Sequence, residues 1–299
     1  MILHLGVDIG GTKIETIVLD AAGTERFRAR EPTPHGSYDE SLELLVRTIR
    51  DAEHAAGARC SIGIGIPGLL SRIDGRLRNA YATPFNGQPL RADLEARLSR
   101  RVRIANDANC FALSEALDGA ARNATVVFGA ILGTGVGGGI AVNGTIVEGA
   151  NAMAGEWGRN PLPGQMASDA LPVCKCGRRG CIEAFLSGHG LAHDHAAVTG
   201  EQLSPEAIVS RAAAGDARCE ATLSRYESRL AVALAGVVNL LDPEVIVLGG
   251  GLSGMSRLYE SIPRLMGPQV YLEPRATRIL PPVHGDASGV RGAAWIGRA

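Results

Sequence analysis

The chain has 299 residues, of which 45% are hydrophobic, so it can bury the core of one large domain or of two smaller ones. Its 30 Lys and Arg residues balance 31 Asp and Glu residues, and a net charge of −1 argues against a nucleic acid or an anionic membrane as the main partner. Aromatic residues make up only 4% of the chain, which leaves few surfaces on which bases could stack.

The most apolar run, residues 230–241, is well short of the ~20 residues that a membrane-spanning helix needs. The N-terminus runs directly into a strand pattern and lacks the features of a signal peptide. We therefore expect a cytoplasmic protein, whose six cysteines are reduced thiols or metal ligands rather than disulfides.

Apolar strand patterns alternate with helical patterns along the chain, which predicts an α/β fold. In the first part we expect strands at 4–8, 14–19, 61–66 and 102–105, and helices at 37–56, 90–98 and 109–117. In the second part we expect strands at 126–132, 140–142 and 244–248, and helices at 217–241, from about 256, and at 289–296. Both parts open with a strand, a glycine turn and a strand, which suggests an internal duplication with a ligand between two lobes.

The first glycine turn, Asp8-Ile-Gly-Gly-Thr-Lys13, places a carboxylate at the end of a strand and a hydroxyl and a cation after two glycines. Backbone N–H groups of such a turn can bind a phosphate, and Thr12 and Lys13 add donors. The turn is not a P-loop, because the residue order differs and a strand follows it. An ordinary hairpin turn is the alternative, and a second similar turn later in the chain favours phosphate binding.

The second turn, residues 133–139, contains a dinucleotide-binding fingerprint, but a strand follows it, so a phosphate-binding hairpin is the better interpretation. A third glycine cluster, residues 249–254, matches the fingerprint after a strand and before a predicted helix. This cluster keeps a dinucleotide oxidoreductase open as an alternative. It lies too near the end of the chain for a complete dinucleotide domain, so we expect it to contact a nucleotide.

Three further groups of residues could carry chemistry. Asn106-Asp107 lies where a strand ends and a helix begins, so it is either a helix cap or the general base of a phosphoryl transfer. Glu156 and Glu183 each lie beside a turn and could accept hydrogen bonds from sugar hydroxyls, or they could be solvated surface acids. Cys174, Cys176 and Cys181 have a spacing common for zinc, although a closed structural site needs a fourth ligand.

Taken together, these motifs resemble the ROK family of sugar kinases and repressors over essentially the whole chain. The segments that carry the resemblance include Asp8-Ile-Gly-Gly-Thr-Lys13, Gly65-Ile-Pro-Gly68, Asn106-Asp-Ala-Asn109, Gly133-Thr-Gly135, Gly155-Glu-Trp-Gly158, Cys176 to Glu183 and Leu248-Gly-Gly-Gly251. Within the family the chain is most similar to bacterial fructokinases that also accept mannose, and related N-acetylglucosamine kinases share much of the pattern.

The resemblance implies a two-lobed actin-like ATPase fold of the ribonuclease H type, often dimeric, with ATP and Mg²⁺ at an interlobe site. It implies a small lobe of residues 1–117, with the helix 288–299 packed back on it, and a large lobe of residues 118–287 that contains the Cys-rich loop. It further implies an ATP-dependent hexose 6-kinase, with fructose first and N-acetylglucosamine, glucose or mannose as alternatives. Because only seven residues precede Asp8, the repressor branch with its DNA-binding extension is disfavoured.

The resemblance also assigns residue roles. Asp107 would be the general base, and Asn106, Gly68, Glu156, Arg159 and Glu183 would line the sugar site. Asp8 would orient Mg²⁺ or its waters, and ATP would be held by Gly10, Gly11, Thr12, Lys13, Gly133, Thr134, Gly135, Gly249, Gly250 and Gly251.

One position departs from the family pattern. The kinases usually read Glu-x-Gly-His, where the histidine ligates zinc with three cysteines and touches the sugar, but this chain has Arg159 there. A guanidinium stays protonated and does not ligate zinc. The change is either tolerated or it loosens the Cys loop and makes the sugar site cationic, so a catalytically weak sugar sensor is the alternative class of function.

Overall fold

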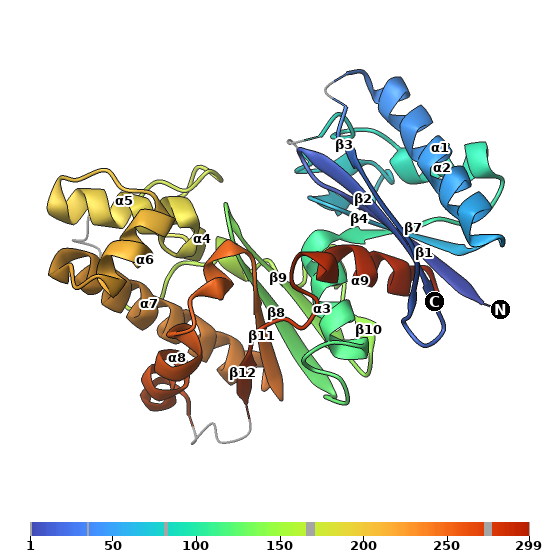
Figure 1. The fold of residues 1–299 in the computed structure, drawn as a ribbon. Helices are drawn as coiled ribbons and strands as arrows, with labels where there is room; N and C mark the ends of the chain where they lie inside the picture. Colours follow the sequence, from blue (N-terminus) through green and yellow to red (C-terminus); the bar gives the residue numbers. More distant parts are fainter. Residues whose placement is uncertain (1, 35, 81–82, 166–170, 272–276, 299) are drawn as a thin grey trace. The chain divides into compact units, whose positions relative to one another are not determined.

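A computed structural model describes residues 2–34, 36–80, 83–165, 171–271 and 277–298 (Figure 1). The chain divides into two compact units. Unit 1 comprises residues 1–122, 139–154 and 283–299, and unit 2 comprises residues 123–138 and 155–282. Residues 139–154 thus belong to unit 1, whereas the sequence division puts them in the large lobe.

Unit 1 is built around a five-stranded sheet in which an antiparallel meander continues into parallel strands. The strands in spatial order are β3 (Glu25–Pro32), β2 (Lys13–Asp20), β1 (Leu3–Ile9), β4 (Ser61–Ile66) and β7 (Arg103–Asn106). A small hairpin, β5 (Leu69–Leu70) and β6 (Leu77–Arg78), follows β4. The helices are α1 (Tyr38–Ala56), α2 (Leu90–Leu98), α3 (Asp107–Leu117) and α9 (Ser288–Gly297), with a 3₁₀ turn at Gly285–Ala287.

Alternate residues of the sheet enter two separate cores. On β2, Ile14 and Val18 pack in the cluster that contains the apolar residues of α1 and α2, whereas Ile17 and Leu19 pack in the cluster that contains those of α3 and α9. This separation follows from the two-residue period of a strand, which sends neighbouring side chains to opposite faces. The sheet therefore has helices on both faces.

The strand β3 is absent from the sequence-based expectation, and its composition explains why. Its apolar residues are few, and Arg26, Arg28 and Arg30 alternate along it. Arg28 and Arg30 pair with the buried Glu15 on β2, so pairing with β2 and ion pairs stabilise this edge strand instead of an apolar face. A pattern search for alternating hydrophobic residues cannot detect such a strand.

The second sheet has the order β10 (Thr145–Ile146), β9 (Val136–Val142), β8 (Val126–Leu132), β11 (Val245–Gly249) and β12 (Arg278–Leu280), and the unit boundary runs through β9. Unit 2 also contains α4 (Ile182–Leu186), α5 (Gly188–Thr199), α6 (Pro205–Ala213), α7 (Ala217–Leu241) and α8 (Leu258–Met266). Three 3₁₀ turns lie at Trp157–Arg159, Gly251–Gly254 and Gly267–Gln269. No helix of the described ranges is long and apolar enough to cross a membrane.

Two expected boundaries change in ways that matter for function. The strand β9 begins at Val136, so most of the second glycine run is strand rather than turn. After β11 the glycines continue as a 3₁₀ turn, and α8 begins only at Leu258. The helix expected from about residue 256 is present, but it begins at Leu258 and not at the glycines, as the dinucleotide fingerprint requires, so the oxidoreductase alternative loses its structural support.

Candidate active site

The first glycine turn joins β1 to β2 and is fixed by the backbone on both sides. Gly10 N donates to Lys13 O at 2.8 Å, and Thr33 Oγ1 donates to Gly10 O at 2.7 Å. Thr33 N also donates to Thr12 O at 3.0 Å. A Cβ atom on Gly10 would lie 3.1 Å from Lys13 O, which is tighter than usual contact. The turn is therefore a rigid loop in which the absence of side chains leaves the backbone accessible.

Lys13 adds a positive charge to this turn. Its Nζ lies 3.6 Å from Glu15 Oε2, and its side chain is 46% exposed. Glu15 is also paired with Arg28 and Arg30, so three cations share one buried carboxylate. Lys13 is thus free to interact with a further anion at little electrostatic cost.

Asp8, at the carboxyl end of β1, lies in a closely packed environment. Cβ atoms on Gly65 and Gly289 would lie 3.2 and 3.0 Å from its carboxylate oxygens. Burial and then the negative charge of Asp107 raise the pKa of Asp8 to about 7, against the opposing effect of Lys13. A divalent cation bound nearby would favour the ionised form, so the residue suits the role of a Mg²⁺ or Mg²⁺-water ligand.

Asn106 and Asp107 connect β7 to α3. Asn106 caps the helix, since its Oδ1 accepts from Ala108 N at 2.9 Å, and its Nδ2 donates to Gly68 O at 2.9 Å. Asp107 Oδ1 also accepts from Ala108 N, at 2.8 Å. Gly68 has a φ of 95°, and a Cβ there would lie 2.3 Å from Arg78 O, so only glycine fits. Asn106 is therefore a helix cap, and the carboxylate of the candidate base Asp107 lies at the same helix start.

Unit 2 contains a pocket of about 720 Å³ in which two of the glycine segments meet. Its lining includes Gly133 and Thr134 after β8, Gly251 and Met255 around the 3₁₀ turn after β11, and His189 on α5. The size and the mixture of apolar side chains with backbone polar groups suit a nucleoside-sized ligand. The α6 residues of this pocket were not singled out from the sequence, because no motif marks them.

The glycines of these segments have different structural roles. Cβ atoms on Gly133 and Gly251 would meet nothing within 4 Å, so open space lies beside both residues. Gly250 has a φ of 80°, and its Cβ would lie 2.5 Å from Leu132 O, so that glycine is required by the fold. A Cβ on Gly135 would lie 2.8 Å from Glu183 Oε2. Gly133 and Gly251 are therefore the glycines best placed for close approach of a ligand.

Glu156, Arg159 and Glu183 form a charged group within unit 2. Arg159 Nη1 donates to Glu183 Oε1 at 2.6 Å, and Arg159 Nε lies 3.9 Å from Glu156 Oε2. Glu183 Oε2 accepts from Val136 N at 3.1 Å. Burial raises the pKa of Glu156, with Glu183 adding to the effect and Arg159 opposing it. Each carboxylate keeps lone pairs that could accept from a sugar hydroxyl.

Trp157 fixes the turn that carries Glu156 and Arg159. Its Nε1 donates to Gly137 O at 2.7 Å, and its ring packs edge-on against Phe128 at 5.6 Å between centroids. A Cβ on Gly158 would lie 2.2 Å from Val136 O, so the chain packs backbone against backbone here. These contacts explain how a short 3₁₀ turn holds its charged side chains in place.

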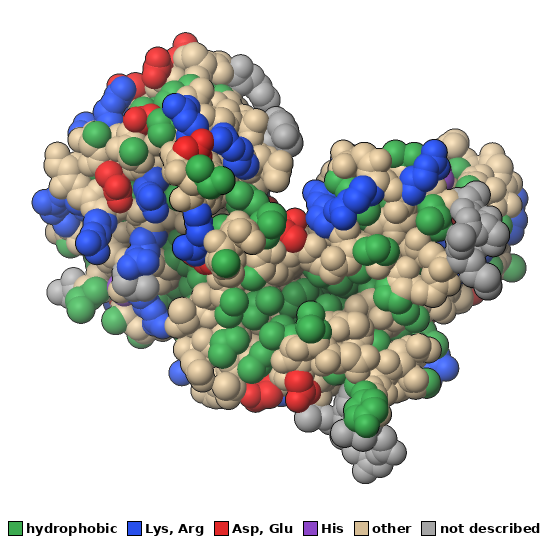
Figure 2. Space-filling view, turned by 180° about the vertical axis from the view of Figure 1, so that it is seen from behind, with side chains coloured by type: hydrophobic (Ala, Val, Ile, Leu, Met, Phe, Trp, Pro, Cys, Tyr) green, Lys and Arg blue, Asp and Glu red, His purple; other side chains and the backbone are tan. Residues whose placement is uncertain are grey.

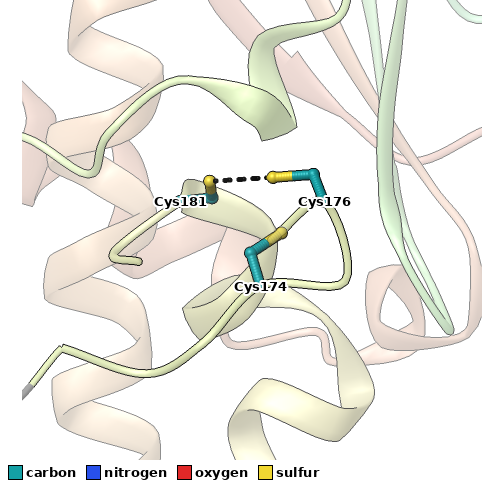
Figure 3. A group of neighbouring side chains, drawn as sticks. All are labelled: Cys174, Cys176 and Cys181. Atoms are coloured by element: carbon teal, nitrogen blue, oxygen red, sulfur yellow. Dashed lines mark hydrogen bonds between the residues drawn. The ribbon is translucent and has the colours of Figure 1, made fainter. Parts of the chain in front are cut away.

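Cys174, Cys176 and Cys181 form a compact cluster in which all three sulfur atoms lie within 4.8 Å of one another (Figure 3). Cys176 and Cys181 are 3.6 Å apart at sulfur. Arg159 Nη1 lies 3.7 Å from Cys174 Sγ, so a guanidinium occupies the neighbourhood in which a fourth ligand would be needed. Burial lowers the pKa of Arg159, but Glu183, Cys174 and Glu156 together outweigh burial and raise this pKa above its ordinary value.

The three thiols therefore fit a metal in their spacing but do not make a closed four-ligand zinc site. Among the described residues no fourth His, Cys, Asp or Glu has a ligand atom within 4.8 Å of all three sulfurs, although Glu183 Oε1 lies 3.8 Å from Cys174 Sγ. His195, one of three histidines nearby in sequence, is buried with its Nδ1 on Thr222 Oγ1 at 2.9 Å. His189 Nδ1 is 3.2 Å from Thr134 O.

The comparisons with known proteins agree over the full length of the chain. The ROK family model matches residues 4–299. The chain belongs to the ROK family. It is 41% identical over 303 residues to an N-acetyl-D-glucosamine kinase of Pectobacterium atrosepticum, and the match covers 98% of both sequences.

Solved structures of ROK kinases have the same fold. A ROK hexokinase from Thermus thermophilus matches with a TM-score of 0.88 and 30% identity, covering 98% of this chain and 97% of that one. A ROK family glucokinase from Streptomyces griseus in complex with glucose and AMPPNP matches with a TM-score of 0.77 and 26% identity, covering 99% of both chains. The expected fold class is confirmed: the chain has the actin-like ATPase fold of these kinases.

Proposed function

We propose that this ROK protein is an ATP-dependent hexose kinase that transfers the terminal phosphoryl group of ATP to the sugar 6-hydroxyl. The observation that carries the proposal is the Asn106–Asp107 segment, where a carboxylate at the start of α3 lies in the electrostatic environment of Asp8. The glycine pocket of unit 2 supports nucleotide binding. The relatives named above are sugar kinases by their names, and the S. griseus enzyme was solved with a sugar and an ATP analogue.

In the proposed reaction Asp107 accepts the proton of the sugar 6-hydroxyl as the hydroxyl oxygen attacks the γ-phosphorus of ATP. The bond between that phosphorus and the β,γ-bridging oxygen breaks, and ADP leaves. Asn106 and the carbonyl of Gly68 form one hydrogen-bonded unit that would orient the sugar beside this base. Glu156 and Glu183 would accept hydrogen bonds from ring hydroxyls. ATP supplies the phosphoryl group, and Mg²⁺ would neutralise the charge of its phosphate oxygens. Asp8 is the proposed residue that orients the metal. The proposed phosphate and nucleotide contacts are Gly10 to Lys13, Gly133, Thr134 and Gly251.

We propose N-acetylglucosamine as the first substrate to test. The sequence motifs favour fructose, but relatives at 41% identity from Pectobacterium and Salmonella are both named N-acetyl-D-glucosamine kinases. Identity at that level over the whole chain outweighs a likeness in a few motifs. Glucose, mannose and fructose remain in the panel as alternative hexoses. We also propose that the protein is a homodimer, which light scattering would test.

A specific observation favours a second candidate, a catalytically weak sugar sensor. Arg159 engages Glu183 and lies beside Glu156, so the proposed sugar site contains a cation between its two carboxylates. Such a site could still bind sugar through its remaining acceptors while positioning it poorly for transfer.

A coupled assay of ADP release with ATP, Mg²⁺ and a panel of hexoses separates the two candidates. A kinase releases ADP only when its sugar is present, and the proposal expects the highest kcat/KM with N-acetylglucosamine. Sugar binding by calorimetry without sugar-dependent ADP release would instead identify a sensor.

A further inference from the structure

Unit 1 contains a polar cavity that the proposed kinase reaction does not use. It has a volume of about 580 Å³ and lies among the edge strands β7 and β10 and the end of α9. Four arginines and one acidic residue contribute to its lining: Arg72, Arg91, Arg103, Arg298 and Glu148. The face of unit 1 that Figure 2 shows carries several exposed Lys and Arg side chains.

Most of the positive charge at this cavity lacks a counterion. Arg72 pairs with Glu148 at 2.7 Å, which neutralises one arginine. Arg91, Arg103 and Arg298 form no ion pair with any carboxylate among the described residues.

The acid on the same helix as Arg91 has a hydrogen-bond partner of its own. Glu95, on the same helix as Arg91, accepts a hydrogen bond from the backbone N–H of Val102 at 3.0 Å. An anion that entered the cavity would therefore meet about three uncompensated guanidinium groups, which can bind phosphate through paired N–H donors.

The shape and the remaining lining limit the kind of anion. The cavity also contains apolar side chains, including Ile104, Ile146 and Trp295, and the guanidinium of Arg298 lies 5.4 Å from the Trp295 ring centroid. Its volume matches a sugar phosphate or a nucleotide rather than a bare ion. A hollow of this size, lined by both arginines and apolar side chains, suits a small molecule with a phosphate group.

The cavity adjoins the candidate sugar residues. A smaller cavity of about 310 Å³ is also lined by Arg72, Arg91 and Glu148, and its lining extends to Asn106. The strand β7 itself runs from Arg103 to Asn106, directly before Asp107. A ligand held by Arg103 would thus act on the strand that positions Asn106.

We propose that this arginine cavity binds a phosphorylated small molecule and that its occupancy changes the affinity of the enzyme for its sugar. The second part rests on the proposed kinase function, whereas the binding itself does not. The chemistry fits the phosphorylated product of a hexose kinase as well as free inorganic phosphate, and the two are distinguished by their affinities.

The test measures direct binding of N-acetylglucosamine 6-phosphate and of inorganic phosphate to the full chain by calorimetry. We expect saturable binding with a Kd of about 1 mM or tighter, and a Kd raised about tenfold or more in the double variant Arg91→Ala/Arg103→Ala. Arg101→Ala is the matched control, because Arg101 is exposed and lines neither cavity. Tighter binding of the sugar phosphate supports a product site, and equal affinities support recognition of the phosphate group alone.

Two outcomes would overturn the proposal. One is the absence of saturable binding by either ligand. The other is an equal Kd for the unmodified chain and the double variant, which would place the ligand elsewhere. Because neither measurement involves turnover, a failure of the kinase assignment leaves this test intact. With active enzyme, occupancy should shift the sugar KM in the unmodified chain and in Arg101→Ala, and the double variant should lose this shift.

Discussion

The guanidinium of Arg159 joins Glu183 to the cysteine cluster: its Nη1 donates to Glu183 Oε1 at 2.6 Å and lies 3.7 Å from Cys174 Sγ. Cys174 Sγ is in turn 3.8 Å from the same carboxylate oxygen. The protonated side chain of Arg159 thus connects Glu183, a proposed sugar-binding residue, to the cysteine loop that a bound metal would otherwise stabilise. This arrangement predicts that the cysteine loop depends on Arg159 rather than on tightly bound zinc.

Purified protein should therefore contain clearly less than one zinc per chain, with thiols that react partly with thiol reagents. Arg159→His should raise the zinc content toward one per chain and increase the melting temperature in zinc relative to chelator, because metal bound only by the folded state stabilises it. The same variant should improve kcat/KM for the sugar. Elemental analysis and thermal unfolding measure the metal effects.

The matched control is Arg159→Gln, which removes the same charge without supplying a metal ligand and should not gain zinc. Stoichiometric zinc in the unmodified protein, with its thiols fully protected, would contradict this account and require another fourth ligand.

Asp107→Asn should reduce kcat by about 10²–10⁴, the usual contribution of a general base. The amide keeps an oxygen that can accept the hydrogen bond from Ala108 N, so folding and sugar binding should change little. Steady-state kinetics with calorimetric sugar binding measures both effects. Near-normal turnover would exclude Asp107 from the proton transfer.

Gly133, which lines the proposed nucleotide pocket, and Gly250, which precedes a lining residue, predict different responses to an added methyl group. Gly133→Ala should raise the KM for ATP with little change in stability, because only open space lies beside Gly133 in the free protein. Gly250→Ala should instead lower the free energy of unfolding by at least about 1–2 kcal/mol, because its positive φ and the close Leu132 carbonyl exclude a side chain.

A substitution at Gly135 would be a less specific test of phosphate binding than this pair. A side chain at 135 would collide with Glu183 and so disturb the proposed sugar site as well. An unchanged KM for ATP in Gly133→Ala would count against ligand contact at that turn.

His284 predicts a pH-dependent contribution to the stability of unit 1. Its Nε2 lies 3.3 Å from Asp118 Oδ1, and the hydrogen bond to Asp118 raises the pKa of His284 against burial and Arg291. A histidine with a raised folded-state pKa contributes its full stability below its unfolded pKa, near 6.5, and loses it as pH rises through the folded value. His284→Gln should therefore cost up to about 1 kcal/mol more at pH 6 than at pH 9 by denaturant unfolding. A pH-independent difference would exclude a charged His284–Asp118 pair.

The sequence predicted the features that depend on local patterns and missed those that depend on distant packing. The helix at 217–241 has matching bounds in the structure because its apolar residues and the end at Asp242-Pro243 are local signals. The strand β3 was missed because its stability comes from Glu15 on another strand. The glycine runs were recognised, but only the structure separates Gly133, beside open space, from Gly250, which is packed on Leu132. The contact of Arg159 with Cys174 was likewise invisible, although the substitution itself was evident.

The most direct test of the kinase assignment is ³¹P NMR of the full chain with ATP, Mg²⁺ and N-acetylglucosamine, with Asp107→Asn as the matched variant. The account predicts that the γ-phosphate signal of ATP falls while equal amounts of ADP and a 6-phosphomonoester of the sugar appear, at a rate reduced about 10²–10⁴-fold in the variant. No phosphomonoester with any hexose of the panel, although sugar and ATP both bind, would contradict it.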